Sequence, residues 1–426
     1  MDIQNLRTFL DSAHSVYHAV ASLVWELEAA GFTCLSEAEA WHLSPGGKYY
    51  ITRGGGSSLI AFQVPNSRPS GFRISATHGD RPTFKVKENG ELTGKYTRLT
   101  TEKYGGMILS PWLDRPLSVA GRVLVETDDG VETRLVDIDR DLLLIPNAAI
   151  HMNREVNNGY KWDLKTDLTA LLGGEDAAGK LYRIIEENAG GRILGQDLYL
   201  YVRQGASQWG VDEEYISAPA LDDLLGTWCC AQGFLAAECT DAVAVLCVFD
   251  NEEVGSQTTQ GADSDLMSRT LSRISESLEL DHLRMLSQSF MVSADNAHAL
   301  HPNHPEYADP ENAPVINRGV VLKFNSSQKY MTDGATAAVI RRIGEKAGVP
   351  MQTYYNRADM LGGSTLGKLS VSQVSIPTVD VGLAQLAMHS CYETAGVRDT
   401  EYMVRLMTKF YGIRYACPED GVYLVD

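Results

Sequence analysis

Ala242 to Gln257 reads AVAVLCVFDNEEVGSQ, an apolar and largely β-branched run that stops abruptly at two adjacent glutamates. The run is typical of a strand buried on both faces, and in an open α/β sheet the working side chains follow the carboxyl ends of such strands. Glu252 and Glu253 would stand at that edge. Because a pleat turns neighbouring side chains in different directions, one carboxylate could bind a cation while the other transfers protons. For an isolated glutamate pair, a solvated acidic turn is the alternative interpretation.

Length, composition and charge narrow the class of protein. A chain of 426 residues predicts two or three domains, and a hydrophobic content of 44% excludes wholesale disorder. No apolar run is long enough to cross a bilayer, and the N-terminal residues lack a secretory apolar core, so we expect a cytoplasmic protein with no membrane partner. A net charge of −18 argues against nucleic acid and anionic membranes as partners.

The cysteines do not predict a metal site. The chain has 7 of them, an odd number, and they lack C-x-x-C spacing. They lie mostly in apolar surroundings, so we interpret them as reduced thiols of the core.

The periodicity of apolar residues predicts strands that alternate with helices around a β-rich insertion. Such alternation indicates an α/β fold with a mixed, mostly parallel sheet flanked by helices. We predict a catalytic domain from residues 1–89 and 211–426, and an inserted β-rich domain from 90–210 whose polar stretch 153–180 is the most mobile region. The expected helices are one long surface helix over 5–28 and helices over 180–188, from 222, within 264–288, and over 334–347 and 400–410. The expected strands are 48–53, 58–64, 72–77, 117–127, 131–138, 242–249, 290–294 and 374–381.

Five residues with metal-ligand chemistry end a strand or begin a helix in this frame, namely His78, Asp222, Glu253, Asp295 and His389. Two imidazoles and three carboxylates suit zinc, manganese or cobalt. Two divalent ions about 3.5 to 4 Å apart that share one carboxylate would use all five and leave room for a water, which loses its proton near neutral pH and becomes a nucleophile. Glu252 would then act as the general base and acid.

Each of these residues also has a simpler interpretation. Asp222 could cap the helix that it begins. The two histidines could be satisfied core residues, and Asp295 could belong to a turn. Asp80 lies two residues after His78, at a spacing that lets a carboxylate accept the second N–H of a ligating imidazole.

Several segments together resemble the aspartyl aminopeptidase family of cocatalytic zinc metallopeptidases. The resemblance covers nearly the whole chain, and each short segment is weak by itself. The segments that carry it are THGDRP (77–82), SAPALDDL (217–224), FDNEEVGS (249–256), SADNAHALHPN (293–303) and MHSCYE (388–393), supported by VYHAV (16–20), WHLSPGGKYYITR (41–53), YGG (104–106), PWLDRPL (111–117), IPNAAIHMNR (145–154), VLKFNSSQKY (321–330) and GGSTLG (362–367).

The resemblance implies a zinc-exopeptidase-like fold and a role for each matched residue. One metal would be held by His78 and Asp295, the other by Glu253 and His389, and Asp222 would bridge them. Glu252 would be the general acid and base, and Asp80 would orient His78. The resemblance further implies that the insertion is a dimerisation domain, that subunits form a tetrahedral dodecamer, that His151 reaches a neighbour's site to bind the developing oxyanion, and that His298, Lys323 and Tyr330 line the substrate pocket.

The sequence departs from the family pattern at two positions. The bridging motif reads LDD instead of LDN, so Asp223 adds a carboxylate near the metals. In RADMLGGST, Gly362 stands where the family often has cysteine. We expect the change at Gly362 to reshape the substrate pocket or its entry loop.

These features predict a metallo-aminopeptidase that removes an N-terminal Asp or Glu from peptide substrates. Lys323 is the candidate to pair with the acidic side chain. A preference for neutral or basic N-terminal residues is the alternative, as are an amidohydrolase or carboxypeptidase-like enzyme on a similar sheet and a metal-stabilised assembly without catalysis.

Overall fold

β13 (Ala242–Phe249), the strand predicted from the apolar run, lies inside a nine-stranded sheet in the computed structural model, which describes residues 3–360 and 362–426. It pairs in parallel with β4 and antiparallel with β3. Five of the eight neighbouring strand pairs in this sheet are parallel, so the predicted mixed, mostly parallel sheet is confirmed. In sheet order the strands are β1 (Thr33–Cys34), β2 (Lys48–Arg53), β3 (Ser58–Gln63), β13, β4 (Gly71–His78), β14 (Phe290–Ala294), β18 (Thr378–Gly382), β16 (Val320–Phe324) and β17 (Met351–Tyr355).

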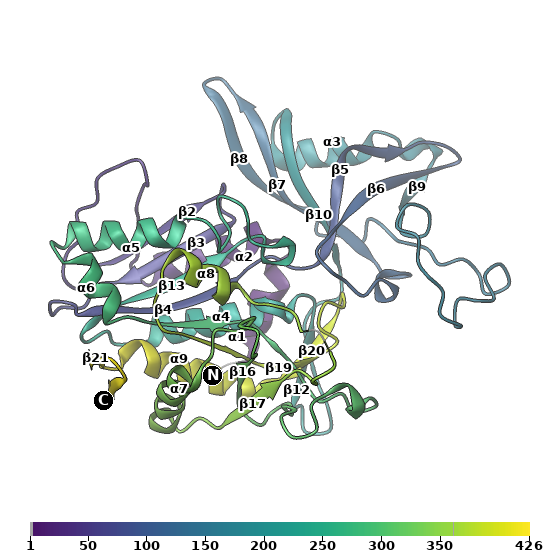
Figure 1. The fold of residues 1–426 in the computed structure, drawn as a ribbon. Coiled ribbons are helices and arrows are strands. Elements are labelled where there is room, and N and C mark those ends of the chain that lie inside the picture. Colours follow the sequence, from purple (N-terminus) through teal and green to yellow (C-terminus); the bar gives the residue numbers. More distant parts are fainter. Residues whose placement is uncertain (1–2, 361) are drawn as a thin grey trace.

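Helices cover both faces of this sheet, and every residue of β13 is buried (Figure 1). Alternate residues such as Leu246 and Val248 pack into one core, while Val245 and Cys247 pack into the other, as the two-residue period of a strand requires. The first core contains residues of α1 (Ile3–Ser12), α2 (Val16–Ala29), α4 (Leu221–Ala236), α7 (Gly334–Ala347) and α9 (Val397–Gly412). The second contains residues of α5 (Leu266–Ser277), α6 (His282–Ser287) and α8 (Leu366–Gln373).

A six-stranded antiparallel sheet forms a separate lobe, at the upper right of Figure 1. Together with α3 (Lys180–Ala189) it has its own hydrophobic core. Its strands in sheet order are β8 (Gly130–Asp137), β7 (Leu117–Thr127), β10 (Ile193–Val202), β5 (Thr83–Leu92), β6 (Tyr96–Tyr104) and β9 (Ala170–Gly174). The separate core supports the proposed division of the chain, with the sheet already beginning at Thr83 and not at residue 90.

A smaller five-stranded sheet lies beside the main one and carries the loop that contains His389. In sheet order it consists of β11 (Ser207–Trp209), β12 (Tyr215–Ala218), β20 (Glu393–Gly396), β19 (Ala384–Leu386) and β15 (Ala297–His298), and a terminal hairpin adds β21 (Tyr415–Glu419) and β22 (Val422–Val425). No helix in the described part of the chain is both long and apolar enough to span a membrane. All 7 cysteines are free thiols, and four of them are buried.

The single surface helix predicted over residues 5–28 is wrong, because the chain turns between α1 and α2. Ser15 has an extended backbone (φ −147°, ψ 169°), and its hydroxyl lies 2.8 Å from His18 Nδ1. The carbonyl of Ala13 accepts a hydrogen bond from Arg81. Both helices bury residues in the same core, so the apolar period continues across the turn and hides it.

Other helix and strand boundaries differ from the predicted ones because of local backbone conformation, capping and proline. The helix expected within 264–288 is divided into α5 and α6, because Glu279 takes a left-handed φ of 52° and Asp281 caps α6 by accepting from the N–H of Arg284. The strand expected from residue 374 begins only at Thr378, after Pro377, which has no N–H to donate to a sheet. The polar stretch 153–180, which was predicted to be mobile, contains the strand β9. The strands β16 and β17 were not predicted from periodicity.

The two lobes are joined by a hydrogen-bonded cluster around Asp137, at the end of β8. His14 Nδ1 lies 2.7 Å from Asp137 Oδ2, and the Tyr201 hydroxyl donates to Asp137 Oδ1 at 2.8 Å. The His14 and Tyr201 rings stack with centroids 4.0 Å apart. Burial works to raise the pKa of Asp137, but the contacts with His14 and Tyr201 lower that pKa below its ordinary value.

We predict that Asp137→Asn lowers the free energy of unfolding by about 1–2 kcal/mol at pH 7, because hydrogen bonds to an ionised carboxylate are lost. Since the pKa of Asp137 is depressed in the folded chain, this stabilisation is present above the ordinary value of 3.8 and disappears as the pH falls through the folded pKa. Urea unfolding followed by tryptophan fluorescence measures the difference. Asp129→Asn, an exposed change of the same charge, is the control, and equal midpoints for the two variants would contradict the prediction.

Candidate metal centre

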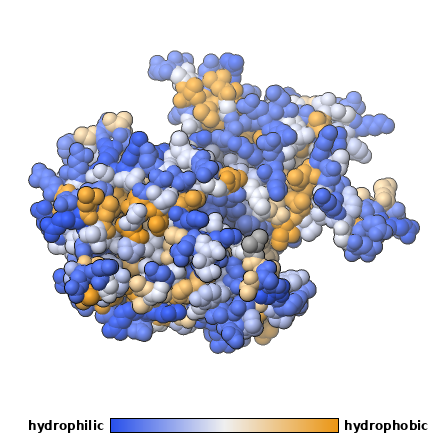
Figure 2. Space-filling view, in the orientation of Figure 1, coloured by the Kyte–Doolittle hydropathy of each residue, from blue (hydrophilic) through white to orange (hydrophobic). Residues whose placement is uncertain are grey.

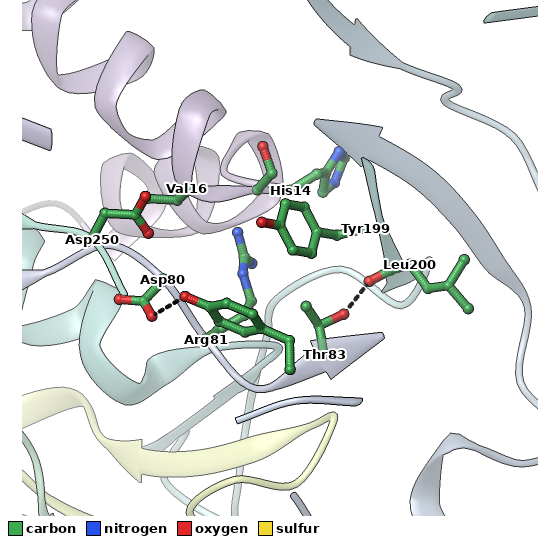
Figure 3. A pocket seen from close by; sticks show the side chains of 10 residues that line it. His14, Val16, Asp80, Arg81, Thr83, Tyr199, Leu200 and Asp250 are labelled. Atoms are coloured by element: carbon green, nitrogen blue, oxygen red, sulfur yellow. Dashed lines mark hydrogen bonds between the residues drawn. The ribbon is translucent and has the colours of Figure 1, made fainter. Parts of the chain in front are cut away.

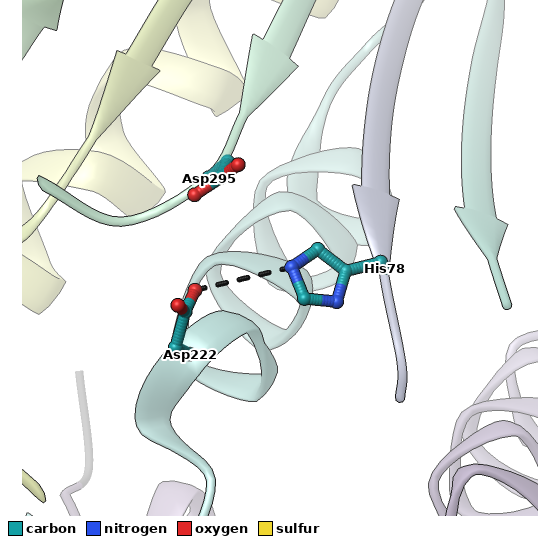
Figure 4. A group of neighbouring side chains, drawn as sticks. All are labelled: His78, Asp222 and Asp295. Carbon is teal, nitrogen blue, oxygen red and sulfur yellow. Dashed lines mark ion pairs between the residues drawn. The ribbon is translucent and has the colours of Figure 1, made fainter. Parts of the chain in front are cut away.

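Three of the predicted ligands meet at the carboxyl edge of the nine-stranded sheet. His78 is the last residue of β4, Asp295 follows β14, and Asp222 lies at the beginning of α4. Their ligand atoms lie within 4.8 Å of one another, and all three side chains are buried. Figure 4 shows His78, Asp222 and Asp295 pointing toward one another. Because β4 and β14 are neighbouring parallel strands, their carboxyl ends reach the same edge.

A second group shares Asp222 with the first. It consists of Asp222, Glu253 and His389, again with ligand atoms within 4.8 Å of one another. His389 Nε2 lies 3.4 Å from Asp222 Oδ2 and 3.5 Å from Glu253 Oε1. All five side chains predicted as ligands therefore converge. His389 does not follow a strand of the main sheet as expected; it lies in the loop between β19 and β20 with a left-handed φ of 66°.

The turn after β13, not the pleat of the strand, separates the two glutamates. Asn251 takes a left-handed φ of 64°, and Glu252 and Glu253 lie in the short 3-10 helix η3 (Glu252–Val254). Glu253 belongs to the second group, whereas Glu252 belongs to neither group and lines the adjacent cavity. The predicted difference in direction is present, but its predicted cause is wrong.

Two carboxylate oxygens show that this group of residues suits cations. Asp222 Oδ1 and Glu253 Oε1 are buried and accept no hydrogen bond within the described chain. A buried oxygen without a donor is costly, and a divalent cation would satisfy it. The Asp222 side chain does not cap a helix, since its Oδ1 accepts no hydrogen bond within the described chain and its Oδ2 lies 3.4 Å from His389 Nε2. Imidazole and carboxylate ligands in this ratio fit zinc.

The pKa shifts of the carboxylates also favour bound cations. Burial and the nearby Asp222 raise the pKa of Glu253 well above its ordinary range. Burial works to raise the pKa of Asp222 too, but the contact with His389 lowers it overall. Burial, opposed by His78 and reinforced by Asp295, raises the pKa of Glu252 to about 8. Carboxylates this close repel one another when ionised, and bound cations would relieve that repulsion.

Asp80 connects His78 with both glutamates. His78 Nδ1 lies 3.2 Å from the Asp80 carbonyl, to which it can only donate, and 3.4 Å from Asp80 Oδ1. The Asp80 carboxylate accepts the backbone N–H groups of Glu252 at 3.1 Å and Glu253 at 3.2 Å. Asp80 therefore contacts the His78 ring through both its carbonyl and its carboxylate, and its orienting role stays a prediction.

Sequence reasoning missed Tyr104, whose hydroxyl donates to Asp80 Oδ2 at 2.7 Å. Burial and the Asp80 charge raise the pKa of Tyr104 well above its ordinary value, so the hydroxyl keeps the proton that it donates. Tyr104 is the last residue of β6, in the other lobe. The only signal in the sequence was its place in the YGG segment.

A cavity of about 310 Å³ opens beside both groups. His298, Lys323 and Tyr330, the predicted substrate residues, line it together with Glu252. Lys323 Nζ already donates to the carbonyl of Asn296 at 2.8 Å and to that of Asp295 at 3.1 Å. Burial works to lower the pKa of Lys323, but Asp295 and Tyr330 raise it above its ordinary value, so the ammonium stays charged.

One predicted residue and the two departures lie outside both metal groups and are not among the residues that line the cavity. His151 is exposed on a turn of the six-stranded lobe and is not among the residues that line the cavity. Asp223 is buried, and burial raises its pKa well above the ordinary range. At Gly362 a Cβ would lie 1.7 Å from Asn356 Nδ2, so cysteine does not fit here while Asn356 keeps its position.

Comparisons with known proteins give a consistent result. The family described as aminopeptidase I zinc metalloprotease (M18) matches residues 9–411. A probable M18 family aminopeptidase 2 from Clostridium novyi is 40% identical over 424 residues, which cover 96% of this chain and 98% of that protein. Ape4, solved in complex with Nbr1, is 34% identical with a TM-score of 0.92, over 96% of this chain and 85% of its own. The mApe1 dodecamer of S. cerevisiae is 27% identical with a TM-score of 0.85, over 96% of both chains.

We predict that zinc-loaded wild-type protein retains two zinc ions per chain after dialysis. Because Asp222 belongs to both groups, Asp222→Asn should retain almost none, whereas His389→Ala should retain about one. Plasma mass spectrometry measures the zinc content. The exposed His42 gives the control His42→Ala, which should retain two, and equal zinc loss in the Asp222 and His389 variants would contradict a shared carboxylate.

Proposed function

The chain belongs to the aminopeptidase I zinc metalloprotease (M18) family, and from this premise we propose that it removes single N-terminal residues from peptides at a dinuclear zinc centre. The observation that carries the proposal is the convergence of five ligand side chains in two groups with Asp222 in common. Asp222 Oδ1 and Glu253 Oε1, which are buried and accept no hydrogen bond within the described chain, support it.

Each proposed ligand has an assigned role in this centre. His78 and Asp295 would hold one ion, Glu253 and His389 would hold the other, and Asp222 would contact both. When bound, the two cations would polarise the scissile carbonyl and lower the pKa of a water between them. Manganese or cobalt could replace zinc, because these ligand types accept several divalent metals.

Glu252 is the proposed general base and acid. It is next in sequence to a ligand but belongs to neither metal group, and it borders the cavity in which a peptide would lie. From there its carboxylate would take a proton from the attacking water and deliver it to the leaving amine. Asp80 would hold the backbone of both glutamates and the His78 ring in place.

We propose that the N-terminal residue removed is acidic, Asp or Glu. Lys323 lines the cavity and stays charged there, which supports recognition of a carboxylate. The alternative, a neutral or basic preference, is favoured by the carbonyls of Asp295 and Asn296, which already accept hydrogen bonds from Lys323 Nζ.

We further propose that the chain is a homo-oligomer, with dimers assembling into a dodecamer. The S. cerevisiae neighbour named above is a dodecamer. Val131, Leu135 and Leu194 on the six-stranded lobe are 56%, 39% and 48% exposed, and Figure 2 shows an apolar patch at the far end of this lobe. Exposed apolar patches commonly mark contacts between proteins. In such an assembly the exposed His151 would be free to reach a neighbour's site. The cytoplasmic location stays a prediction.

Replacing Glu252 with glutamine tests its role as base. We expect Glu252→Gln to retain wild-type zinc content and fold while its kcat falls by about 10² to 10⁴-fold, since an amide cannot accept the proton. Stopped assays with a free-amine peptide measure kcat. Glu401→Gln, at an exposed position of α9, is the control, and near-normal turnover of the Glu252 variant would show that the base lies elsewhere.

A substrate panel separates the candidate functions. The aminoacyl chromophores of Asp, Glu, Leu and Lys should give the highest kcat/KM for the acidic residues, and Lys323→Met should reduce that preference by about tenfold or more because the cation is lost. N-acetylated substrates should not be cleaved. Faster release of Leu or Lys would favour the alternative preference, while cleavage of blocked substrates alone would indicate an amidohydrolase.

A further inference from the structure

The six-stranded lobe touches the metal centre through one short segment. After β6 the chain runs through Tyr104, Gly105, Gly106, Met107 and Ile108, here named the 104–108 strap. Residues of the strap contact Asp80, Glu253 and His389, which come from three different parts of the catalytic lobe. Nothing in the proposed mechanism uses these contacts.

Tyr104 makes the most specific contact. Its hydroxyl donates to Asp80 Oδ2 at 2.7 Å and accepts from Asn251 Nδ2 at 2.9 Å. Asp80 Oδ2 also accepts the N–H of Glu253 at 3.2 Å, while Oδ1 accepts that of Glu252 at 3.1 Å. The Tyr104 hydroxyl therefore fixes the rotation of the Asp80 carboxylate, which accepts hydrogen bonds from the backbone of η3 and faces His78.

Two further contacts bring the strap close to the proposed ligands Glu253 and His389. Gly105 has a left-handed φ of +75°, and a Cβ there would lie 3.1 Å from the Cβ of Glu253. The N–H of Ile108 donates to the carbonyl of His389 at 3.0 Å. Glycine takes this φ without strain, whereas a Cβ at position 105 would be strained and would crowd Glu253.

We propose that Tyr104 is a positioning residue of the active centre, which acts through Asp80 on His78, Glu252 and Glu253, and that the 104–108 strap makes the metal centre depend on the seating of the six-stranded lobe. This inference rests on the proposed function. A ligand supported by a fixed partner binds its metal more tightly, and removing such a partner commonly costs 10–100-fold in metal affinity or activity.

The neighbouring Tyr199 provides a matched control. It lies on β10, its ring meets that of Tyr104 edge to face with centroids 5.7 Å apart, and within the described chain its hydroxyl makes no hydrogen bond. Figure 3 shows Tyr199 and Asp80 lining the same small pocket. Each Tyr→Phe change thus removes one hydroxyl from the same aromatic pair.

The test compares Tyr104→Phe, Tyr199→Phe and the wild-type full-length chain. Zinc affinity is measured by competition with a chromophoric chelator, kcat and KM with a free-amine peptide, and fold by circular dichroism and melting. We expect Tyr104→Phe to lose 10–100-fold in zinc affinity, in kcat or in both, with KM within about twofold, because the substrate pocket itself is unchanged. Tyr199→Phe should stay within about twofold of wild type in all three quantities.

Equal zinc affinity and equal kcat for the two variants would overturn the inference, as would a rise in KM as the only effect. If Tyr104→Phe does not fold, Gly105→Ala decides: its Cβ would displace the strap from Glu253, so zinc affinity should fall, and wild-type affinity would overturn the inference. A wild-type chain that binds zinc but cleaves no free-amine peptide would remove the proposed function, while the comparison of zinc affinities would still decide the role of Tyr104.

Discussion

Mutual repulsion among buried carboxylates is the constraint on which this structure depends. Asp222, Glu253 and Asp295 converge at one edge of the nine-stranded sheet, with Glu252 beside them. Burial works to raise the pKa of all four side chains, and it does so overall in three of them; the pKa of Asp222 is lowered overall because His389 contacts it. Such a group stays ionised only if positive charge is brought to it. Lys323 supplies one positive charge beside Asp295, and Asp222 Oδ1 and Glu253 Oε1, which accept no hydrogen bond within the described chain, would be satisfied by bound cations.

The scaffold holds this arrangement from several directions. β4, β13 and β14 end at one edge, so that His78, the glutamate turn and Asp295 are near one another before any side chain is oriented. Asp222 comes from a helix and His389 from a loop of the smaller sheet. Asp80, which follows β4, then accepts hydrogen bonds from the backbone N–H groups of Glu252 and Glu253. The catalytic lobe therefore supplies all the proposed ligands, and the second lobe contributes the 104–108 strap, which contacts Asp80, Glu253 and His389.

Much of this could be predicted from the sequence, because residues that end buried strands carry a local signal. The apolar run before Glu252 and Glu253 indicated β13 and the sheet edge, and His78 and Asp295 follow strands in the same way. His389 was also predicted to follow a strand, but it lies in a loop of the smaller sheet, whose short strands periodicity does not reveal; the family resemblance named the same residue without depending on that placement. The turn near Ser15 was hidden, because both flanking helices bury residues in one core. Tyr104 could not be predicted to contact Asp80, because that contact depends on how two lobes pack together.

Anomalous diffraction from crystals of the zinc-loaded chain, recorded on both sides of the zinc absorption edge, tests the central claim most directly. The account predicts two zinc peaks per chain, one in contact with His78 and Asp295, the other with Glu253 and His389, and both in contact with Asp222. A single peak, or peaks that leave Asp222 without a metal, would contradict it.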